Sequence, residues 1–187
     1  RGGTLRPMIA ALFVAKGGCY FGPQDVDPWD EERDARKYAG PWPVVAHPPC
    51  ARWCQLACIV EARYPYLKAG EDDGCFASAL ESVRTWGGVL EHPAFTKAWP
   101  EYGLPAPVSD AGWQRCIDGG WVCEVSQAAY SHRARKMTWL YAVLPGLPPS
   151  ADWSRPGGSA TMSWLTNHGG RDERMGFDRP RLWRSDL

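Results

Sequence analysis

Short apolar runs alternate along this chain with charged stretches and with turns rich in Gly and Pro. The spacing predicts one buried strand in each of the runs 9–15, 43–46, 89–90, 121–125 and 138–143, because each run is too short for a long helix. Gly17-Gly18 follows the first run, and a Gly pair favours a sharp turn there.

Three stretches between these runs have features of helices. Residues 31–38 start acidic and end basic, and Asp27 or Asp30 is placed to cap them. Residues 51–62 follow the second strand. A third helix is expected from Asp72 or Gly74 to Val83, with one apolar stripe of Cys75, Phe76, Ala79, Leu80 and Val83.

Strands that alternate with helices predict an α/β protein. A length of 187 residues fits one domain. We therefore expect a single Rossmann-like, three-layer catalytic domain over residues 1–150, with a reduced and mostly parallel sheet. Residues 151–187 lose periodicity and are rich in Pro, Gly and Ser, which predicts a loop-rich tail or lid.

Composition narrows the classes of function. The net charge of zero argues against a purely electrostatic nucleic-acid binder, although it allows a local basic face. No apolar run approaches the roughly 20 residues that span a bilayer, so no membrane partner is expected. Seven cysteines without the spacing of a secreted disulfide framework favour a reduced, cytoplasmic setting.

Cys50, Cys54 and Cys58 recur every four residues. A zinc site is conceivable, but such sites usually combine paired C-x2-C units, and the chain has none. We expect no metal, and we expect Cys54 and Cys58 to be buried structural thiols.

Three short motifs lie at expected strand ends: His47-Pro48-Pro49-Cys50, Glu91-His92-Pro93, and the basic cluster His132-Arg133-Ala134-Arg135-Lys136. Each alone is also compatible with an ordinary turn or a solvated face. Together they suit attack on C6 of a pyrimidine. Pro49 fixes the thiol of Cys50, a carboxyl can share a proton with a ring nitrogen, and cations favour thiolate formation. His47 could tune the thiol, and it could equally be a structural histidine.

The order of these motifs resembles that of the cytosine-C5 DNA methyltransferases, especially their short phage-borne relatives. Pro49-Cys50 matches the Pro-Cys of the family's catalytic loop, and Glu91-His92-Pro93 is similar to its Glu-Asn-Val or Glu-Asn-Pro motif. Arg133-Ala134-Arg135, with Gln127 upstream, resembles its Gln-x-Arg-x-Arg motif. The resemblance spans residues 9–143. It implies that Cys50 is the nucleophile, that Glu91 protonates N3, and that Arg133 or Arg135 contacts the base oxygen or the phosphate of a flipped nucleotide. His92, His132 and Lys136 would then lie against the DNA substrate.

The same resemblance implies S-adenosylmethionine as the methyl donor. Phe13-Val14-Ala15-Lys16-Gly17-Gly18 is a loose copy of the family's Phe-x-Gly-x-Gly motif, and Asp25 or Asp27 would bind the ribose hydroxyls. The stretch from Val14 to Val44 is shorter than in the family, so the cofactor half is reduced. No target-recognition domain is evident.

The leading hypothesis is a pyrimidine-modifying enzyme, in a bacterial or phage-infected cell, that transfers a methyl or other one-carbon group to C5 of cytosine in DNA. A second keeps the thiol attack but uses another donor or a free nucleotide. A third is a non-catalytic nucleic-acid-binding protein on a decayed methyltransferase scaffold, in which the cluster from Arg133 to Lys136 carries the function.

Overall fold

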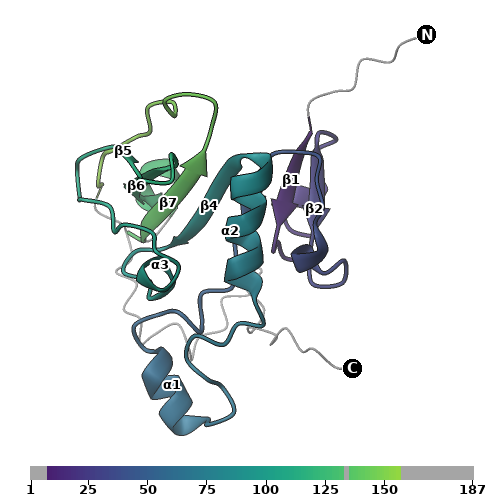
Figure 1. Ribbon diagram of the computed structural model, residues 1–187, viewed down its shortest axis with the longest axis vertical. Helices are drawn as coiled ribbons and strands as arrows, with labels where there is room; N and C mark the ends of the chain where they lie inside the picture. The colour runs from purple at the N-terminus through teal and green to yellow at the C-terminus, as the bar shows by residue number, and fades with distance from the viewer. Residues whose placement is uncertain (1–7, 133–134, 157–187) are drawn as a thin grey trace.

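Seven strands form one mixed sheet in the computed structural model, which describes residues 8–132 and 135–156 (Figure 1). The strand order is β2-β1-β3-β4-β7-β6-β5. Three pairings are parallel, β1 (Ile9–Leu12) with β2 (Val26–Trp29), β1 with β3 (Val44–Ala46), and β3 with β4 (Gly88–Pro93). Three are antiparallel, and they join β4, β7 (Met137–Val143), β6 (Trp121–Ser126) and β5 (Gln114–Arg115). The α/β class is confirmed, but parallel pairings make up only half of the sheet.

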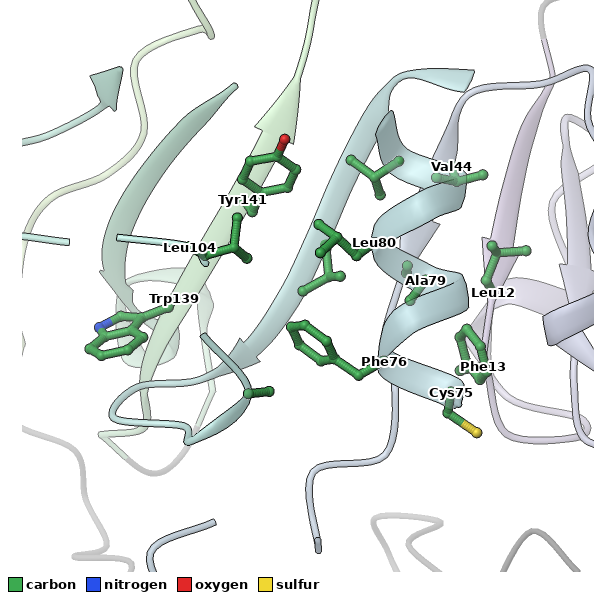
Figure 2. Close-up of a cluster of buried hydrophobic side chains, with 14 of the residues drawn as sticks. Leu12, Phe13, Val44, Cys75, Phe76, Ala79, Leu80, Leu104, Trp139 and Tyr141 are labelled. Carbon is green, nitrogen blue, oxygen red and sulfur yellow. The ribbon is translucent and has the colours of Figure 1, made fainter. Parts of the chain in front are cut away.

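One long helix, α2 (Cys75–Trp86), packs against the middle of the sheet (Figure 1). Its predicted apolar stripe is confirmed, since Cys75, Phe76, Ala79, Leu80 and Val83 are all buried. Figure 2 shows Phe76, Ala79 and Leu80 of this stripe among residues of the strands, which include Leu12, Val44 and Tyr141. Burial of this stripe removes apolar surface from water and stabilises the packing of α2 on the sheet.

The expected third layer is not seen in the described residues. The short helix α1 (Ala57–Arg63) lies beyond the carboxyl ends of the parallel strands and covers no face of the sheet (Figure 1). It is shorter than the predicted helix over 51–62 because residues 51–56 form turns. Trp53 anchors these turns, since its side chain is buried and its indole N–H donates to Asp72 at 2.8 Å.

The predicted helix over 31–38 is wrong. The segment forms turns and a single 3-10 turn, η2 (Ala35–Lys37). Asp34 adopts a left-handed backbone with φ of 55°, and its carboxylate accepts from the N–H and the guanidinium of Arg36. A side chain that bonds its own backbone in this way competes with the helical hydrogen bonds.

Further short elements were not predicted. They are β2, β5, the helix α3 (Ala98–Glu101), and the 3-10 turns η1 (Cys19–Phe21) and η3 (Gln127–Tyr130). Strand β2 contains Pro28, which a sheet accepts here because β2 is an edge strand.

The first residues of the predicted tail pack on the antiparallel half of the sheet. Arg155 pairs with Glu124 of β6 at 2.8 Å and with Asp110 at 2.9 Å. Trp153 meets Trp113 edge to face. Residues 157–187 lie outside the described part, and so does most of the predicted tail. Within residues 8–132 and 135–156, no helix has the length and apolar character to cross a bilayer.

Candidate active site

The carboxyl ends of β1, β3 and β4 bring together segments that are remote in sequence. Ala46 of β3 pairs with Leu90 of β4, so the next residues, His47 and Glu91, are neighbours across the two strands. The N–H of His47 also donates to the carbonyl of Leu12 at 3.0 Å, which ties the loop after β3 to the end of β1. The carboxyl edge of parallel strands is where open α/β sheets bind ligands.

Glu91 lies at the centre of this edge and is surrounded by donors. Its Oε2 is 3.2 Å from Nδ1 of His47, and its Oε1 accepts from Nε2 of Gln127 at 3.2 Å. The ammonium of Lys136 is 3.6 Å from the same Oε1. Burial alone would raise the pKa of Glu91, but the hydrogen bond from His47 and the charge of Lys136 outweigh it and lower the pKa to about 2. The free protein therefore holds Glu91 as a carboxylate at neutral pH.

Cys50 lies near these charges in a half-buried position. Burial raises the pKa of its thiol, the positive charge of Lys136 opposes that shift, and the negative charge of Glu91 adds to it. The net direction is upward, whereas the sequence analysis expected cations to favour the thiolate. The cause is that burial and Glu91 together outweigh the single cation.

The loop that carries Cys50 is held on both sides. The N–H of Trp53 donates to the carbonyl of Cys50 at 3.0 Å, and the carbonyl of Trp53 accepts from Lys97 at 2.8 Å. Asp72 receives both the Trp53 indole N–H and the backbone N–H of Phe76, each at 2.8 Å. The same carboxylate thus caps α2 and fixes the loop, which positions the thiol relative to the sheet.

His92 does not reach this edge. Its side chain is 1% exposed, and its Nδ1 is 2.7 Å from Oγ1 of Thr96. The ring packs against Phe76 and Trp99. Successive residues of a strand face opposite sides of the sheet, so His92 faces the core where Glu91 does not. The structure therefore does not bring His92 together with Glu91 at this edge, and the side chain packs in the core.

Burial lowers the pKa of His92 to about 4, and the charge of Glu91 and the carbonyl of Pro49 oppose that shift. Its Nε2 has no hydrogen-bond partner of acceptable geometry among the described residues. The ring is therefore neutral at physiological pH. Pro49 itself is half-buried beside Cys50, as expected of a residue that fixes the loop.

The described residues of the basic cluster contact the site through Glu91 and Gln127. Lys136 is the member that pairs with Glu91. Arg135 is exposed, His132 donates its N–H to the carbonyl of Gln127 at 3.2 Å, and Arg133 lies outside the described residues. The expected catalytic roles of Arg133 and Arg135 therefore stay predictions.

The five residues expected to bind the cofactor do not gather at one place. Phe13 follows β1 and is buried, and Gly17 and Gly18 form an exposed turn after it. The carbonyl of Asp25 accepts from Ile9 at 3.0 Å, which places Asp25 at the opposite, amino-terminal edge of the sheet. Asp27 is occupied on both oxygens, by Arg33 at 2.6 Å and by the indole of Trp29 at 2.8 Å.

Asp30 follows β2 directly, so it is the acidic residue that lies at the carboxyl end of that strand. It is buried, and its Oδ1 accepts from the N–H of Arg33 at 3.1 Å. From the sequence, Asp30 was expected only as a helix cap. The residues predicted to hold S-adenosylmethionine therefore do not fit that group as the resemblance implies, because Asp25 and Asp27 are misplaced or occupied.

Two residues of the site were missed or given no role by sequence reasoning. Tyr20, in η1, has its hydroxyl 2.8 Å from Nε2 of His47. Gln127 bridges Glu91 and Thr138, whose Oγ1 it reaches at 3.0 Å. Gln127 carried a signal, since the resembled motif begins with Gln. Tyr20 carried none, because its place depends on how the turn after β1 folds back over β3.

The cysteines other than Cys50 divide by position. Cys54 is buried, as expected, whereas Cys58 is exposed on α1, and that prediction is wrong because α1 lies away from the core. All seven cysteines are free thiols.

Across the described part of the chain, no three His, Cys, Asp or Glu side chains cluster as metal ligands would. Comparison with protein-family models, curated proteins and solved structures finds no match to this chain.

Proposed function

We propose that this protein is a pyrimidine-modifying enzyme of Rossmann-like fold that acts on cytosine in DNA through the thiol of Cys50. The observation that carries the proposal is that Cys50, Glu91 and Lys136 lie within electrostatic reach of one another at one sheet edge, although they come from three separate segments. This set of groups suits a cytosine ring. The nucleophile would attack C6, the ionised acceptor would bind N3–H and the exocyclic amino group, and the cation would bind O2.

The first step is addition of the thiol across the C5=C6 bond. The sulfur electron pair forms the bond to C6, and the displaced π pair moves through C5 and C4 to N3. The proton that leaves Cys50 ends on N3, so the step needs no outside acid or base. The ammonium of Lys136 would stabilise charge at O2 of the ring.

Glu91 acts in this step as an acceptor. Its pKa of about 2 makes it a poor proton donor at neutral pH, but a carboxylate accepts well from the N3–H of the adduct and from the exocyclic amino group. A carboxylate offers about four acceptor positions, and His47 and Gln127 use two of them. Lys136, at 3.6 Å, forms an ion pair and no hydrogen bond, so two positions remain for the base. The role differs from the proton donor that the resemblance implies, because the proton comes from the thiol.

The adduct is then an electron-rich carbon nucleophile at C5. It attacks an activated one-carbon donor, loses its C5 proton, and releases Cys50 as the C5=C6 bond forms again. S-adenosylmethionine would supply an electrophilic methyl group here. Since Asp25 and Asp27 do not form its binding site, we assign no residue to the donor and leave its identity to experiment.

The test is nucleoside mass spectrometry on DNA from cells that express the wild-type chain, Cys50→Ala or Cys54→Ala. Cys54→Ala is the matched control, because Cys54 lies one turn away in the same loop and takes no part in the proposal. We expect a modified deoxycytidine with wild type and Cys54→Ala and none with Cys50→Ala. A gain of one methylene would identify methyl transfer. Identical nucleosides in all three samples and in empty cells would overturn modification of DNA.

A further inference from the structure

Tyr20, His47 and Glu91 form a continuous chain of hydrogen-bonding groups. The hydroxyl of Tyr20 is 2.8 Å from Nε2 of His47, and Nδ1 of the same ring is 3.2 Å from Oε2 of Glu91. The three residues come from η1, from the end of β3 and from β4. Because Glu91 is a carboxylate, it accepts from Nδ1–H, which leaves Nε2 to accept from the Tyr20 hydroxyl.

The Glu91 end of this chain lies by the candidate nucleophile, and the Tyr20 end lies against the ring of His47, three residues before Cys50 in the loop after β3. Glu91 acts electrostatically on Tyr20 and on Cys50. The side chain of His47 is 31% exposed, and Tyr20 is half-buried, so the chain is open to a substrate and not enclosed in the core. A hydrogen-bonded phenol, imidazole and carboxylate in series have the arrangement of a nucleophile–histidine–acid triad, with a phenol at the reactive end.

We propose that Tyr20 removes the C5 proton of the thiol adduct and passes its own proton to His47, which Glu91 positions and stabilises. This inference rests on the proposed attack of Cys50 on C6. Tyr20 would touch the reacting hydrogen, whereas His47 acts through Tyr20.

The proton transfer balances within these groups. The C5–H proton moves to Oη of Tyr20 while the phenolic proton moves to Nε2 of His47. The electron pair of the C5–H bond forms the C5=C6 double bond, and the C6–S pair leaves with the sulfur of Cys50. The imidazolium that results is paired with the carboxylate of Glu91, which lowers the energy of the charged state. Loss of the Nε2 proton to solvent resets the chain.

Other groups at the edge are less suited to this step. Lys136 is a cation and cannot accept a proton, Gln127 does not titrate in water, and Cys50 is bonded to C6. Burial raises the pKa of Tyr20, so the phenol is neutral and cannot act as a free phenolate. A neutral phenol accepts a proton only if it loses its own at the same time, and His47 is placed to receive it.

The experiment needs no donor. Thiol addition without transfer lets C5 exchange its hydrogen with solvent, so the purified protein is incubated with a cytosine-containing oligonucleotide in D2O. Deuterium at C5 is read by mass spectrometry. A second oligonucleotide carries 5-azacytosine, whose ring has no hydrogen on carbon at that position, and reports thiol addition as a covalent adduct. Variants are Tyr20→Phe, His47→Gln and Cys50→Ala, with Tyr66→Phe as the control for an exposed tyrosine.

We expect Tyr20→Phe to slow exchange at least about 100-fold, the usual range for loss of a general acid or base, and to leave the 5-azacytosine adduct at the wild-type rate. His47→Gln should also slow exchange, and Tyr66→Phe should not. Exchange at the wild-type rate in Tyr20→Phe, or an adduct slowed as much as the exchange, would overturn the proton transfer through Tyr20 and His47. It would leave the proposed attack of Cys50 on C6 intact. If the wild-type protein shows no exchange and forms no adduct, both the proton transfer through Tyr20 and the proposed attack of Cys50 on C6 are overturned.

Discussion

Nδ1 of His47 lies 3.2 Å from Oε2 of Glu91, although 44 positions separate the two residues in the sequence. The contact follows from register. Ala46 pairs with Leu90 in the parallel ladder of β3 and β4, so His47, which follows β3, lies beside Glu91, which continues β4 and pairs with Leu140 of β7. A one-residue slip of β4 would point Glu91 into the core and bring His92 to the edge in its place.

Thiol reactivity is the first prediction. In the free protein at pH 7.5, Cys19 and Cys58 should be alkylated faster than Cys50, because both are exposed while burial raises the pKa of Cys50. Lys136→Met should slow the labelling of Cys50 further, because the ammonium opposes that shift. Peptide mapping after timed labelling with iodoacetamide measures each rate. Cys75 and Cys123 are fully buried and serve as protected controls. Labelling of Cys50 ahead of Cys19 would contradict the structure.

The second prediction concerns acid stability. The pKa of His92 is about 4 in the folded protein and near 6.5 when exposed, so the unfolded chain binds the extra proton first as pH falls. The free energy of unfolding should therefore fall between pH 6.5 and 4, by about 3 kcal/mol at most from this residue. Denaturant titrations at pH 7.5, 5.5 and 4.5 would show the slope, and His92→Gln should flatten it. An equal slope in both proteins would exclude His92 as its source.

Glu91 affects stability in a lower pH range, since its stabilising contribution is lost only as pH falls from about 4.5 toward about 2.

Gly88 is the subject of the third prediction. Its φ is +119°, and a Cβ at this position would lie 1.9 Å from the carbonyl oxygen of Val44. Gly88→Ala should destabilise the protein by about 3 kcal/mol or more, because the new methyl group would force β3 and β4 apart. Gly103→Ala is the matched control, since Gly103 also has a positive φ but meets no atom within 4 Å. It should cost about 1 kcal/mol. Equal losses in urea denaturation would mean that strand spacing is not the cause.

The fourth prediction concerns the ion pair between Arg155 and Glu124 on the antiparallel half of the sheet. The side chain of Glu124 is 3% exposed and receives Arg155, Ser109 and the indole of Trp139. Arg155→Ala should destabilise the protein by about 2 kcal/mol, because it leaves a buried carboxylate short of its cation. Adding Glu124→Gln should recover part of that loss, which denaturant titration of the double variant would measure. Lys16→Ala is the control: its pair with Glu32 is exposed, and no measurable change is expected.

The sequence by itself determined the α/β class of the fold and several residues of the candidate site, among them His47, Cys50 and Glu91. Apolar runs of two to seven residues, turns at Gly and Pro, and the stripe of α2 are local signals, and they predicted five of the strands and the long helix. The motifs at the ends of β3 and β4 were predicted at strand ends, and the structure brings Cys50, His47 and Glu91 together there. The carboxyl ends of parallel strands lie at one edge of a sheet, so the order of strands and helices in the sequence predicts that these residues lie together.

The tertiary structure decided what each residue can do. Alternation in β4 points Glu91 to the edge and His92 into the core, and only the register fixes which residue takes which side. The pKa of Cys50 depends on burial and on the sum of nearby charges, so the shift expected from neighbouring basic residues alone had the wrong direction. Tyr20 enters the site because the turn after β1 folds back onto His47. That contact joins two loops, and no periodicity in the sequence encodes it.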